Sequence, residues 1–370
     1  MDRSIAMYRL RRMDWWLIAA TAALFVLGVL FIYSASYRGD GIPVAGFYKR
    51  QILWGAVGIG CMAVLTLVDY QRLGESCWVW YGISLALLAL VLVVGPRVSG
   101  ASRWLQIIGI RVQPSELAKL TTLIAVAWTL SRPGQDLRDP KLVLQTGLVV
   151  LIPFLLIFME PDLGTAMMMA PLALGMMYAA GVPLKTLSFL VLLAVLLLPV
   201  GWLVLDDYQQ ERILVFFDAD RDPLGAGWNK IQSEIAVGSG GLTGKGYLAG
   251  TQNVLGFLPR SVAPTDFIFS VVAEELGFVG SGLVLSLYAA VLIGVIRAAL
   301  LSRDKLGRLV AVGVAMLLFS HVLVNIAMTI GLMPITGLPL PLMSYGGSFM
   351  VCTMCGLGLV QSVYVRRRRR

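Results

Sequence analysis

Long apolar segments alternate with short polar connections along this chain. A window of about 20 residues, the length of helix that crosses a bilayer, finds ten of them. They cover 15–36, 52–69, 77–95, 115–131, 142–159, 164–181, 185–205, 266–297, 307–331 and 345–365. This pattern predicts ten transmembrane helices in a single membrane domain, 1–370. The one long connection is 206–265, between the seventh and eighth segments.

Composition excludes a soluble globular class. Hydrophobic residues make up 58% of the chain, charged residues 14%, and the mean hydropathy is +0.81. Such values are typical of a polytopic all-α membrane protein. The first apolar segment has no obvious small-residue cleavage site after it, which favours a retained helix over a removed signal peptide.

Basic residues gather at both ends of the chain. The N-terminus carries Arg3, Arg9, Arg11 and Arg12, and the C-terminus ends in Arg366–Arg370. An even number of spans places both termini on one side, and basic flanks favour the cytoplasm. We therefore expect a multi-pass protein of the cytoplasmic membrane with segment 206–265 outside, and no nucleic-acid partner.

Three carboxylates interrupt the eighth apolar segment, in the stretch "VAPTDFIFSVVAEELGFVG". They are Asp266, Glu274 and Glu275. Removing an unpaired carboxylate from water costs roughly several kcal/mol. Charged side chains within a membrane therefore usually face a cavity or a partner. On a continuous helix, Asp266, Ser270 and Glu274 would share one face. That face is predicted to line a polar cavity.

The connection between the third and fourth segments, "RWLQIIGIRVQPSELAKL" (103–120), carries a second group of polar residues. Ser115 is predicted to cap a helix, and Glu116 is spaced to pair with Lys119 on one face. Trp104 and the aliphatic residues after it favour a re-entrant element that dips back into the membrane interface.

Two further motifs leave a binding role and a structural role equally open. The glycine-rich "GSGGLTGKGYLAGTQ" (238–252) surrounds Lys245, which suits an approaching anion or a tight turn. "EPDLGTA" sets Glu160 and Asp162 at a helix start, where a carboxylate is favoured by the helix dipole or serves as a plain cap.

Two other features are expected inside the bundle. The stretch "PITGLPLPLMSYGGSFM" (334–350) is rich in proline and glycine, which is typical of backbone that lines a cavity or breaks a helix. His321 lies one turn before Asn325 in the ninth segment, and no carboxylate is spaced to form a proton relay with it. We expect polar contacts between helices there.

Taken together and in order, the motifs resemble those of the SEDS family. The motifs are "QPSELAKL", "EPDLGTA", "DPLGAGWNKIQSEIAVGSGGLTGKGYLAGTQ", "TDFIFSVVAEELG" and "PLPLMSYGGS". The chain is more similar to the RodA, or rod shape-determining, branch than to the FtsW division branch. The resemblance covers nearly the whole chain, and several long motifs in sequence are more specific than any one of them.

The resemblance implies a peptidoglycan glycosyltransferase. Such an enzyme polymerises lipid II into glycan strands on the outer face of the cytoplasmic membrane during elongation. It implies a class B penicillin-binding protein as the crosslinking partner, alongside other membrane proteins of the elongation complex. The aspartate of the TDFIF motif is Asp266 here, expected to act as general base in an inverting displacement with undecaprenyl pyrophosphate as leaving group.

The residues expected to bind the lipid II and glycan substrates are polar or aromatic groups in the same motifs. They are Arg103, Trp104, Arg111, Gln113, Glu116, Lys119, Asp162, Gln232, Ser239, Lys245, Thr265, Glu274 and Ser344. The cations among them would neutralise the leaving group. A divalent cation, Mg²⁺ or Mn²⁺, would suit this chemistry, although the sequence does not identify its ligands. No nucleotide or organic cofactor is expected.

One position departs from the family pattern. Pro264 precedes Thr265 where the family usually has histidine, so no histidine is expected to orient Asp266, and Thr265 is expected to do more of that work. Two other functions remain open. A lipid II flippase would need a charged path through several spans, and a scaffold for cell-wall enzymes would not need the carboxylate of Asp266.

Overall fold

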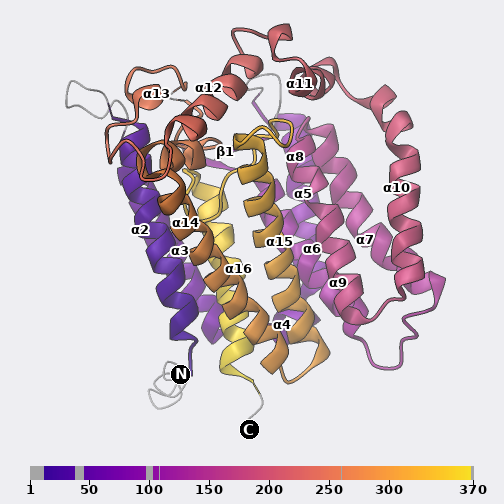
Figure 1. The fold of residues 1–370 in the computed structure, drawn as a ribbon. Helices are drawn as coiled ribbons and strands as arrows, with labels where there is room; N and C mark the ends of the chain where they lie inside the picture. The colour runs from indigo at the N-terminus through magenta and orange to yellow at the C-terminus, as the bar shows by residue number, and fades with distance from the viewer. Residues whose placement is uncertain (1–11, 38–45, 97–102, 108, 260, 368–370) are drawn as a thin grey trace.

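The computed structural model describes residues 12–37, 46–96, 103–107, 109–259 and 261–367. They form a bundle of long helices that run between two ends of the molecule (Figure 1). Arg367 donates a hydrogen bond to the carbonyl oxygen of Arg12 at 2.8 Å, so the two termini meet at one end. This agrees with an even number of spans. The remaining terminal arginines of the prediction lie outside the described residues: Arg3, Arg9, Arg11 and Arg368–Arg370.

The elements follow the predicted apolar segments closely. In chain order they are α2 (Trp15–Ala35), α3 (Phe47–Leu67), α4 (Tyr70–Glu75), α5 (Cys77–Val94), β1 (Leu105–Ile107), β2 (Ile110–Val112), α6 (Pro114–Ser131), α7 (Pro140–Met159), α8 (Leu163–Met167), α9 (Met169–Ala180), α10 (Leu184–Val204), α11 (Asp207–Phe217), η1 (Ala219–Arg221), α12 (Ala226–Ser239), α13 (Thr251–Val254), α14 (Ile268–Leu301), α15 (Lys305–Thr329) and α16 (Gly347–Val365).

Nine segments in the described part of the chain are long and apolar enough to cross a membrane, counting α8 and α9 together. The tenth predicted segment, 115–131, forms α6. This helix carries Glu116 and Lys119 and is buried along almost its whole length. The prediction of an all-helical, multi-pass membrane protein is confirmed.

Helices α6 and α10 have opposite environments. α6 packs against α5, α7, α9 and α15 and occupies the interior. α10 stands at the edge of the bundle and contacts α9 (Figure 1), and only 6% of its most apolar window is buried. Its large apolar side chains face outward, which suits a helix surrounded by lipid.

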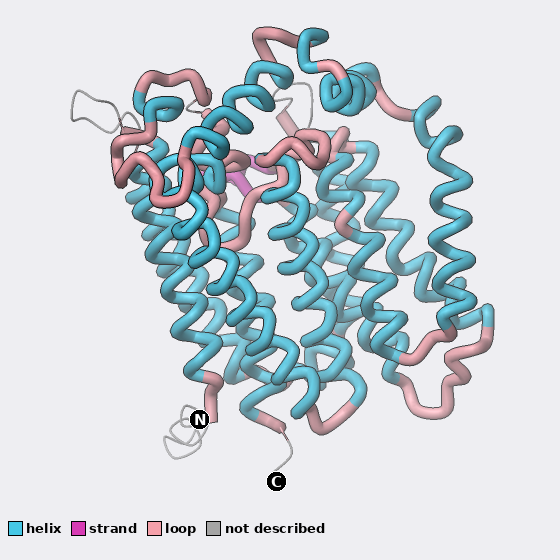
Figure 2. The backbone as a smooth tube through the Cα atoms, viewed as in Figure 1, coloured by secondary structure: helices cyan, strands magenta, loops and turns pink. Residues whose placement is uncertain are grey.

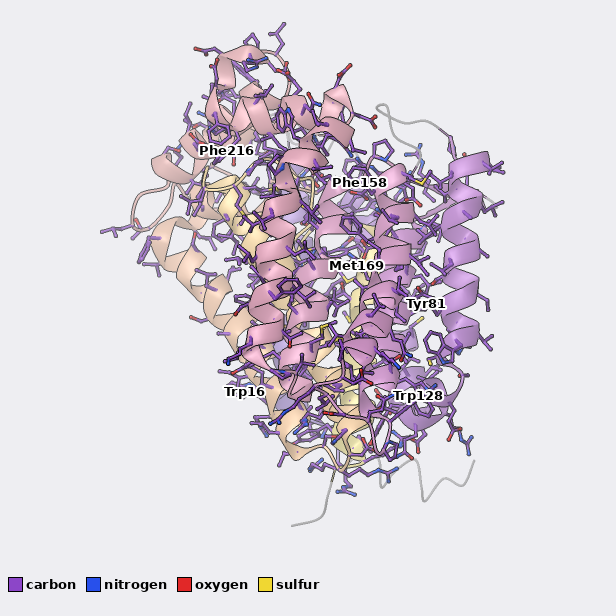
Figure 3. All side chains as sticks on the ribbon, turned by 90° about the vertical axis from the view of Figure 1, so that its right-hand side faces the viewer. Trp16, Tyr81, Trp128, Phe158, Met169 and Phe216 are labelled. Atoms are coloured by element: carbon purple, nitrogen blue, oxygen red, sulfur yellow. The ribbon has the colours of Figure 1, made fainter. Side chains whose placement is uncertain are left out.

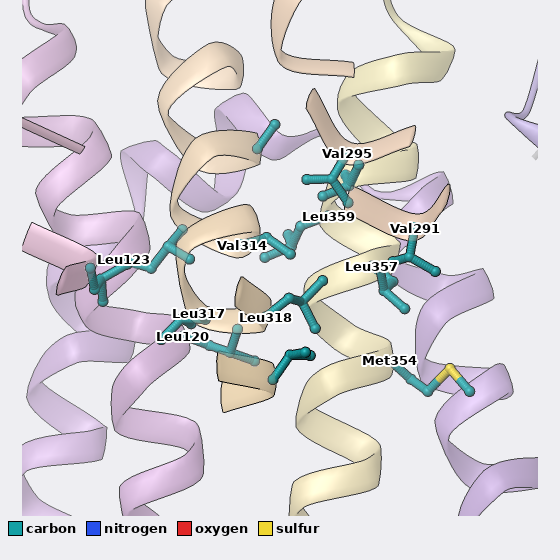
Figure 4. Packing of buried hydrophobic residues seen from close by; sticks show 14 of the residues in the cluster. Leu120, Leu123, Val291, Val295, Val314, Leu317, Leu318, Met354, Leu357 and Leu359 are labelled. Atoms are coloured by element: carbon teal, nitrogen blue, oxygen red, sulfur yellow. The ribbon is translucent and has the colours of Figure 1, made fainter. Parts of the chain in front are cut away.

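The apolar core lies where α6, α14, α15 and α16 meet (Figure 4). The buried apolar side chains that pack there include Leu120, Leu123, Val291, Val295, Val314, Leu317, Leu318, Met354, Leu357 and Leu359. Close approach of α3 and α16 depends on a small residue. A Cβ on Gly358 would lie 2.8 Å from the carbonyl oxygen of Met62, so glycine is needed for this helix contact.

Exposed tryptophans and other aromatic residues lie toward the ends of the bundle. Trp16, 58% exposed, and Trp128 lie toward the end that carries the termini, and Phe216 lies at the opposite end (Figure 3). Amphipathic aromatic rings favour the membrane–water interfaces. The distribution therefore fits a bundle that crosses the bilayer along its long axis.

Segment 206–265 lies across the end of the bundle opposite the termini, which we call the loop end (Figure 2). It is largely helical, comprising α11, η1, α12 and α13. The sequence predicted one long connection here without identifying these helices. Helical hydrogen bonds satisfy much of the backbone of this segment.

The glycine-rich turn of this segment docks on a kink in α14. Gly277 has a φ of 65° and a ψ of −159°, which interrupts the helix. The amide of Phe278 donates to Gly241 O at 2.9 Å, and that of Val279 donates to Leu242 O at 3.1 Å. The turn thus supplies the backbone partners that the kink removes from the helix. The structural role weighed for these glycines is present.

The segment predicted to be re-entrant takes the form of a short hairpin. β1 and β2 pair antiparallel, with Leu105 opposite Val112. The amide of Gln113 donates to Ser348 Oγ at 3.1 Å, which fixes the hairpin to α16. The predicted Ser115 cap is wrong, because α6 begins at Pro114 with Gln113 as its N-cap, and Ser115 Oγ is buried without a partner.

Candidate active site

Asp266 lies in the turn that leads into α14, at the loop end of the bundle. Its amide donates to Val262 O at 2.9 Å, and its carbonyl oxygen accepts from Asn325 Nδ2 at 2.8 Å. The helix begins at Ile268. The prediction that Asp266, Ser270 and Glu274 form one helical face is therefore wrong for Asp266, whose side chain is positioned by a turn.

The proline-rich stretch 334–350 holds this turn from the other side. The amide of Tyr345 donates to Pro264 O at 2.8 Å, and Ser344 Oγ donates to Thr265 O. Asn325 bonds the same stretch through Leu338 O at 2.7 Å. The backbone before Asp266 is thus clamped between α15 and the stretch that precedes α16. Ser344 acts on the turn through backbone contacts.

The position that departs from the family pattern contributes through its backbone. Pro264 has no amide hydrogen and so cannot donate a backbone hydrogen bond. Its carbonyl oxygen accepts a hydrogen bond from the amide of Tyr345. Thr265 Oγ1 lies 3.1 Å from Val262 O and beside the Asp266 carboxylate, and its hydroxyl lowers the carboxyl pKa when it donates to that carboxylate. The predicted orienting role of Thr265 is compatible with this arrangement.

The pKa of the Asp266 carboxyl is higher in the protein than that of a free aspartate in water. Burial raises the pKa of Asp266 to about 6, although the positive charges of Arg212 and Arg103 lower it. A carboxyl with this pKa is ionised at neutral pH and still close to the pH at which it accepts a proton. These are the properties of a general base.

Arg212, on α11, is the cation with the largest effect on Asp266. Its guanidinium donates to Thr336 O at 3.2 Å and lies 4.7 Å from the centre of the Tyr208 ring. Gly337 separates the two charges. A Cβ built there would lie 3.5 Å from Asp266 Oδ2 and 3.6 Å from Arg212 Nη1.

Arg103 and Asp162 form the next part of the site. Arg103 Nη1 lies 3.8 Å from Asp162 Oδ1, and Arg103 Nη2 donates to Pro161 O. Gln113 Nε2 donates to Asp162 Oδ2 at 3.3 Å. Asp162 also accepts from the amide of Thr165 at the start of α8. It is therefore both a helix cap and a part of the charged cluster.

Glu160 is the least satisfied carboxyl of this region. It is fully buried, and neither side-chain oxygen has a hydrogen-bond partner. Burial and the negative charge of Asp162 raise the pKa of Glu160 to about 9, although Arg103 lowers it. The group is neutral at pH 7 unless a cation approaches.

Glu116, Lys119 and His321 form a separate cluster inside the bundle. Lys119 Nζ donates to Glu116 Oε1 at 2.8 Å and to His321 Nε2 at 2.9 Å, and it lies 5.6 Å from the centre of the Phe349 ring. The predicted Glu116–Lys119 pair is present. A cavity of about 40 Å³ adjoins the cluster. The bonds among the three side chains hold α6 against α15.

Lys245 and Glu274 also pair with each other. Lys245 Nζ lies 2.7 Å from Glu274 Oε1, which further accepts from Thr251 Oγ1 at 3.1 Å and from the amide of Gln252 at 2.9 Å. Ser34 of α2 donates to the neighbouring Glu275. These contacts engage one oxygen of each carboxyl and join α14 to the glycine-rich turn and to α2, while Glu274 Oε2 and Glu275 Oε2 are buried without a partner.

The other expected substrate-binding residues are more dispersed. Gln232 is buried on α12, and Ser239, at the end of that helix, donates to Ala236 O at 3.1 Å. Arg111 is exposed on β2, and Trp104 is half-buried just before β1. Of all the expected residues, the structure gathers five around Asp266: Arg103, Gln113, Asp162, Thr265 and Ser344.

Sequence reasoning did not assign Arg212 or Asn325 to the site. Arg212 is one of several charged residues in 206–265, and only the docking of α11 brings it to Asp266. Asn325 is noticeable in the sequence as a polar side chain in an apolar segment. Its two hydrogen-bond partners are backbone carbonyl oxygens, which residue spacing does not predict. Glu160 was singled out only as a residue at a helix start.

Taken together, the geometry defines a polytopic membrane protein with a carboxyl of raised pKa at the loop end, close to two arginines. Comparison with known proteins agrees with this class. The family model FTSW_RODA_SPOVE, described as "Cell cycle protein", matches residues 15–369. The chain belongs to this family.

Named relatives are similar over almost their whole length. Peptidoglycan glycosyltransferase MrdB of Escherichia coli strain K12 is 39% identical over 350 residues, which cover 94% of this chain and 92% of that protein. Peptidoglycan glycosyltransferase RodA of Treponema pallidum is 32% identical over 426 residues, covering 96% and 98%.

Two solved structures share the fold. One, described as the structural coordination of polymerization and crosslinking by a peptidoglycan synthase complex, gives a TM-score of 0.78 at 34% identity, covering 95% of this chain and 97% of that one. The crystal structure of Thermus thermophilus rod shape determining protein RodA gives 0.72 at 32% identity, covering 97% and 98%.

Proposed function

We propose that this chain is a peptidoglycan glycosyltransferase that polymerises lipid II into glycan strands during cell elongation. The observation that carries the proposal is Asp266, a carboxyl with a pKa of about 6 beside Arg212 and Arg103 at the loop end of the bundle. Family membership and the names of the relatives support the same reaction. The loop end is then the outer face of the cytoplasmic membrane, and both termini lie in the cytoplasm.

In the mechanism, ionised Asp266 accepts the proton of the acceptor's GlcNAc 4-hydroxyl. The freed oxygen attacks the anomeric carbon of the donor's MurNAc, with inversion, and undecaprenyl pyrophosphate leaves. The bonds from Asn325 and Ser344 hold the turn before Asp266, so that the carboxylate is positioned before substrate binds. The nearby arginines stabilise the negative charge that develops on the leaving group.

A divalent cation, Mg²⁺ or Mn²⁺, fits the residues only together with substrate. Within the described residues, no three His, Cys, Asp or Glu side chains gather to hold a metal. Glu160 has two buried oxygens without partners, and Asp162 lies two residues further on. Mg²⁺ commonly uses one or two carboxylates and completes its shell with substrate phosphates. Such an ion would neutralise pyrophosphate charge.

The partner we propose is a class B penicillin-binding protein that crosslinks the glycan strands, within a complex that includes other elongation proteins. The similarity to a chain from a peptidoglycan synthase complex supports this. Polymerisation and crosslinking would then take place on the same side of the membrane. No observation in the described part of the chain favours the flippase or scaffold alternatives.

The proposal is tested by polymerisation of purified lipid II with the class B partner. We expect Asp266→Asn to lower the rate by about 10²–10⁴-fold, the usual contribution of general base catalysis. Arg221→Gln is the control, because Arg221 is exposed and pairs with Glu211 in the same segment. Equal polymer from Asp266→Asn would remove Asp266 from the chemistry. Translocation of labelled lipid II across the membrane without polymer formation would support the flippase function instead.

A further inference from the structure

Four buried side-chain oxygens lie without partners where the glycine-rich turn meets α14. Among the described residues, Glu274 Oε2, Glu275 Oε2, Gln252 Oε1 and Asn253 Oδ1 accept no hydrogen bond. They come from two pairs of adjacent residues, one pair on α14 and one on α13. A buried acceptor without a partner destabilises the fold and needs an explanation.

Hydrogen bonds hold the two pairs against each other. The amide of Gln252 donates to Glu274 Oε1 at 2.9 Å. Asn253 Nδ2 donates to Ser34 O at 2.7 Å, and Ser34 Oγ donates to Glu275. Asn253 is only 1% exposed, and because its Nδ2 is engaged by Ser34, its Oδ1 is the atom left for a ligand. α13 lies beside the end of α2 at the loop end (Figure 1).

Both carboxyl groups approach Gly250, which has no side chain to fill the space. A Cβ built there would lie 2.9 Å from Glu274 Oε2 and 3.2 Å from Glu275 Oε1. The backbone amides of Leu248 and Gly250 lie near the Glu275 carboxyl and leave its Oε2 without a hydrogen bond. The turn thus brings the two carboxyls together.

The two carboxyls share one cation. Lys245 Nζ lies 2.7 Å from Glu274 Oε1, and a quarter of the lysine side chain is exposed. In the part of the chain that the structure describes, no ion pair includes Glu275. A second positive charge is therefore electrostatically favoured beside the free oxygens.

We infer that Glu274, Glu275 and the amide oxygens of Gln252 and Asn253 bind a Ca²⁺ ion, which fastens the glycine-rich turn to α14. Carboxylate and amide oxygens are the donors that hard divalent cations prefer. A closed site of side-chain oxygens suits Ca²⁺, because Mg²⁺ usually keeps several waters. This site is separate from the cation proposed beside the pyrophosphate, and it does not depend on the transferase reaction.

The test is equilibrium binding of radioactive calcium to the full chain in a neutral detergent, without substrate. Glu275→Gln removes a charge and keeps the oxygen that accepts from Ser34. Gly250→Ala places a Cβ against Glu274 Oε2. Gly250 has a φ of −65°, so alanine there strains no left-handed backbone.

Each variant has a matched control. Glu211→Gln removes an exposed carboxylate that pairs with Arg221 in the same loop segment. Gly238→Ala adds a Cβ at the end of α12, where it meets nothing within 4 Å.

Wild type should bind Ca²⁺ saturably, with half-saturation on the order of 0.1–1 mM, as extracellular calcium modules do. Each site variant should weaken this binding by about tenfold or more, because it loses a charged ligand or the space for the ion. The controls should stay within about twofold of wild type. Wild type without saturable binding, unchanged binding in either site variant, or Mg²⁺ that displaces Ca²⁺ at equal concentration would overturn the inference.

Thermal unfolding with Ca²⁺ or with EGTA separates ion binding from damage to the fold. A ligand that binds only the folded chain raises the unfolding midpoint. We expect Ca²⁺ to raise the midpoint of wild type and of both controls, and not that of Glu275→Gln or Gly250→Ala. A variant that is merely less stable keeps the full rise with Ca²⁺, and that result would contradict the site.

Discussion

The setting of Asp266 shows how one residue's chemistry depends on distant parts of the chain. Its position in an apolar segment was enough to predict a functional carboxyl, because a charge there needs a reason. The groups that tune it could not be predicted in the same way. Arg212 comes from α11 and Asn325 from α15, and no spacing in the sequence relates either residue to Asp266.

The pH dependence of the reaction follows from this residue. Because the pKa of Asp266 is about 6, we expect the polymerisation rate to fall as pH decreases through about 6, where the base becomes protonated. Arg212→Gln removes the strongest of the positive charges that lower this pKa, so the midpoint should move to higher pH. Initial rates across about pH 5 to 8 check both points.

The matched control for the pH series is Arg221→Gln, because Arg221 is exposed and is not one of the charges that shift the pKa of Asp266. Its midpoint should equal that of wild type. A rate that does not change with pH, or an equal shift in both arginine variants, would contradict the assignment of Asp266 as the titrating base.

At the level of elements, the kink of α14 and the glycine-rich turn form one structural unit. The sequence indicated Lys245 and Glu274 separately as anion-binding and cavity residues, but not their contact with each other. They are 29 residues apart, and the connection between them has no helical period that would bring them together. The contact depends on Gly277, whose left-handed φ no spacing rule predicts.

We expect Gly277→Ala to destabilise the protein by about 2 kcal/mol or more, since a Cβ strains the left-handed backbone. This Cβ would also lie 2.3 Å from Gly244 N and 2.7 Å from Leu242 O. Gly282→Ala on the same helix is the control, because a Cβ there meets nothing within 4 Å. Thermal unfolding in detergent compares them, and equal midpoints would show that the turn does not depend on the kink.

For the whole molecule, hydropathy alone predicted the order and approximate limits of nine membrane helices in the described part of the chain, and its tenth segment is the buried helix α6. Long apolar segments have one stable form in a bilayer, so their prediction did not depend on knowing their neighbours. The hairpin before α6 and the helices of 206–265 were not predicted. Short elements such as α13, Thr251–Val254, are marginal alone and form because tertiary contacts hold them.

Orientation in the membrane can be checked at this scale. Leu224, 94% exposed at the loop end, and Asp136, exposed between α6 and α7 at the end that carries the termini, are changed to cysteine one at a time. We expect a membrane-impermeant maleimide to label Leu224→Cys on intact spheroplasts and Asp136→Cys only after lysis. The native cysteines lie within spanning helices, so wild type is the background control. The reverse labelling would invert the topology.

The clamp on the turn before Asp266 has a consequence for biosynthesis. The bonds from Ser344 and Tyr345 to that turn come from the stretch just before the last helix, and Gln51 Nε2 in turn donates to Ser344 O at 2.9 Å. A nascent chain therefore contains Asp266 and both arginines long before their arrangement exists. The bonds that hold this turn are therefore complete only when synthesis has reached the residues just before the last helix.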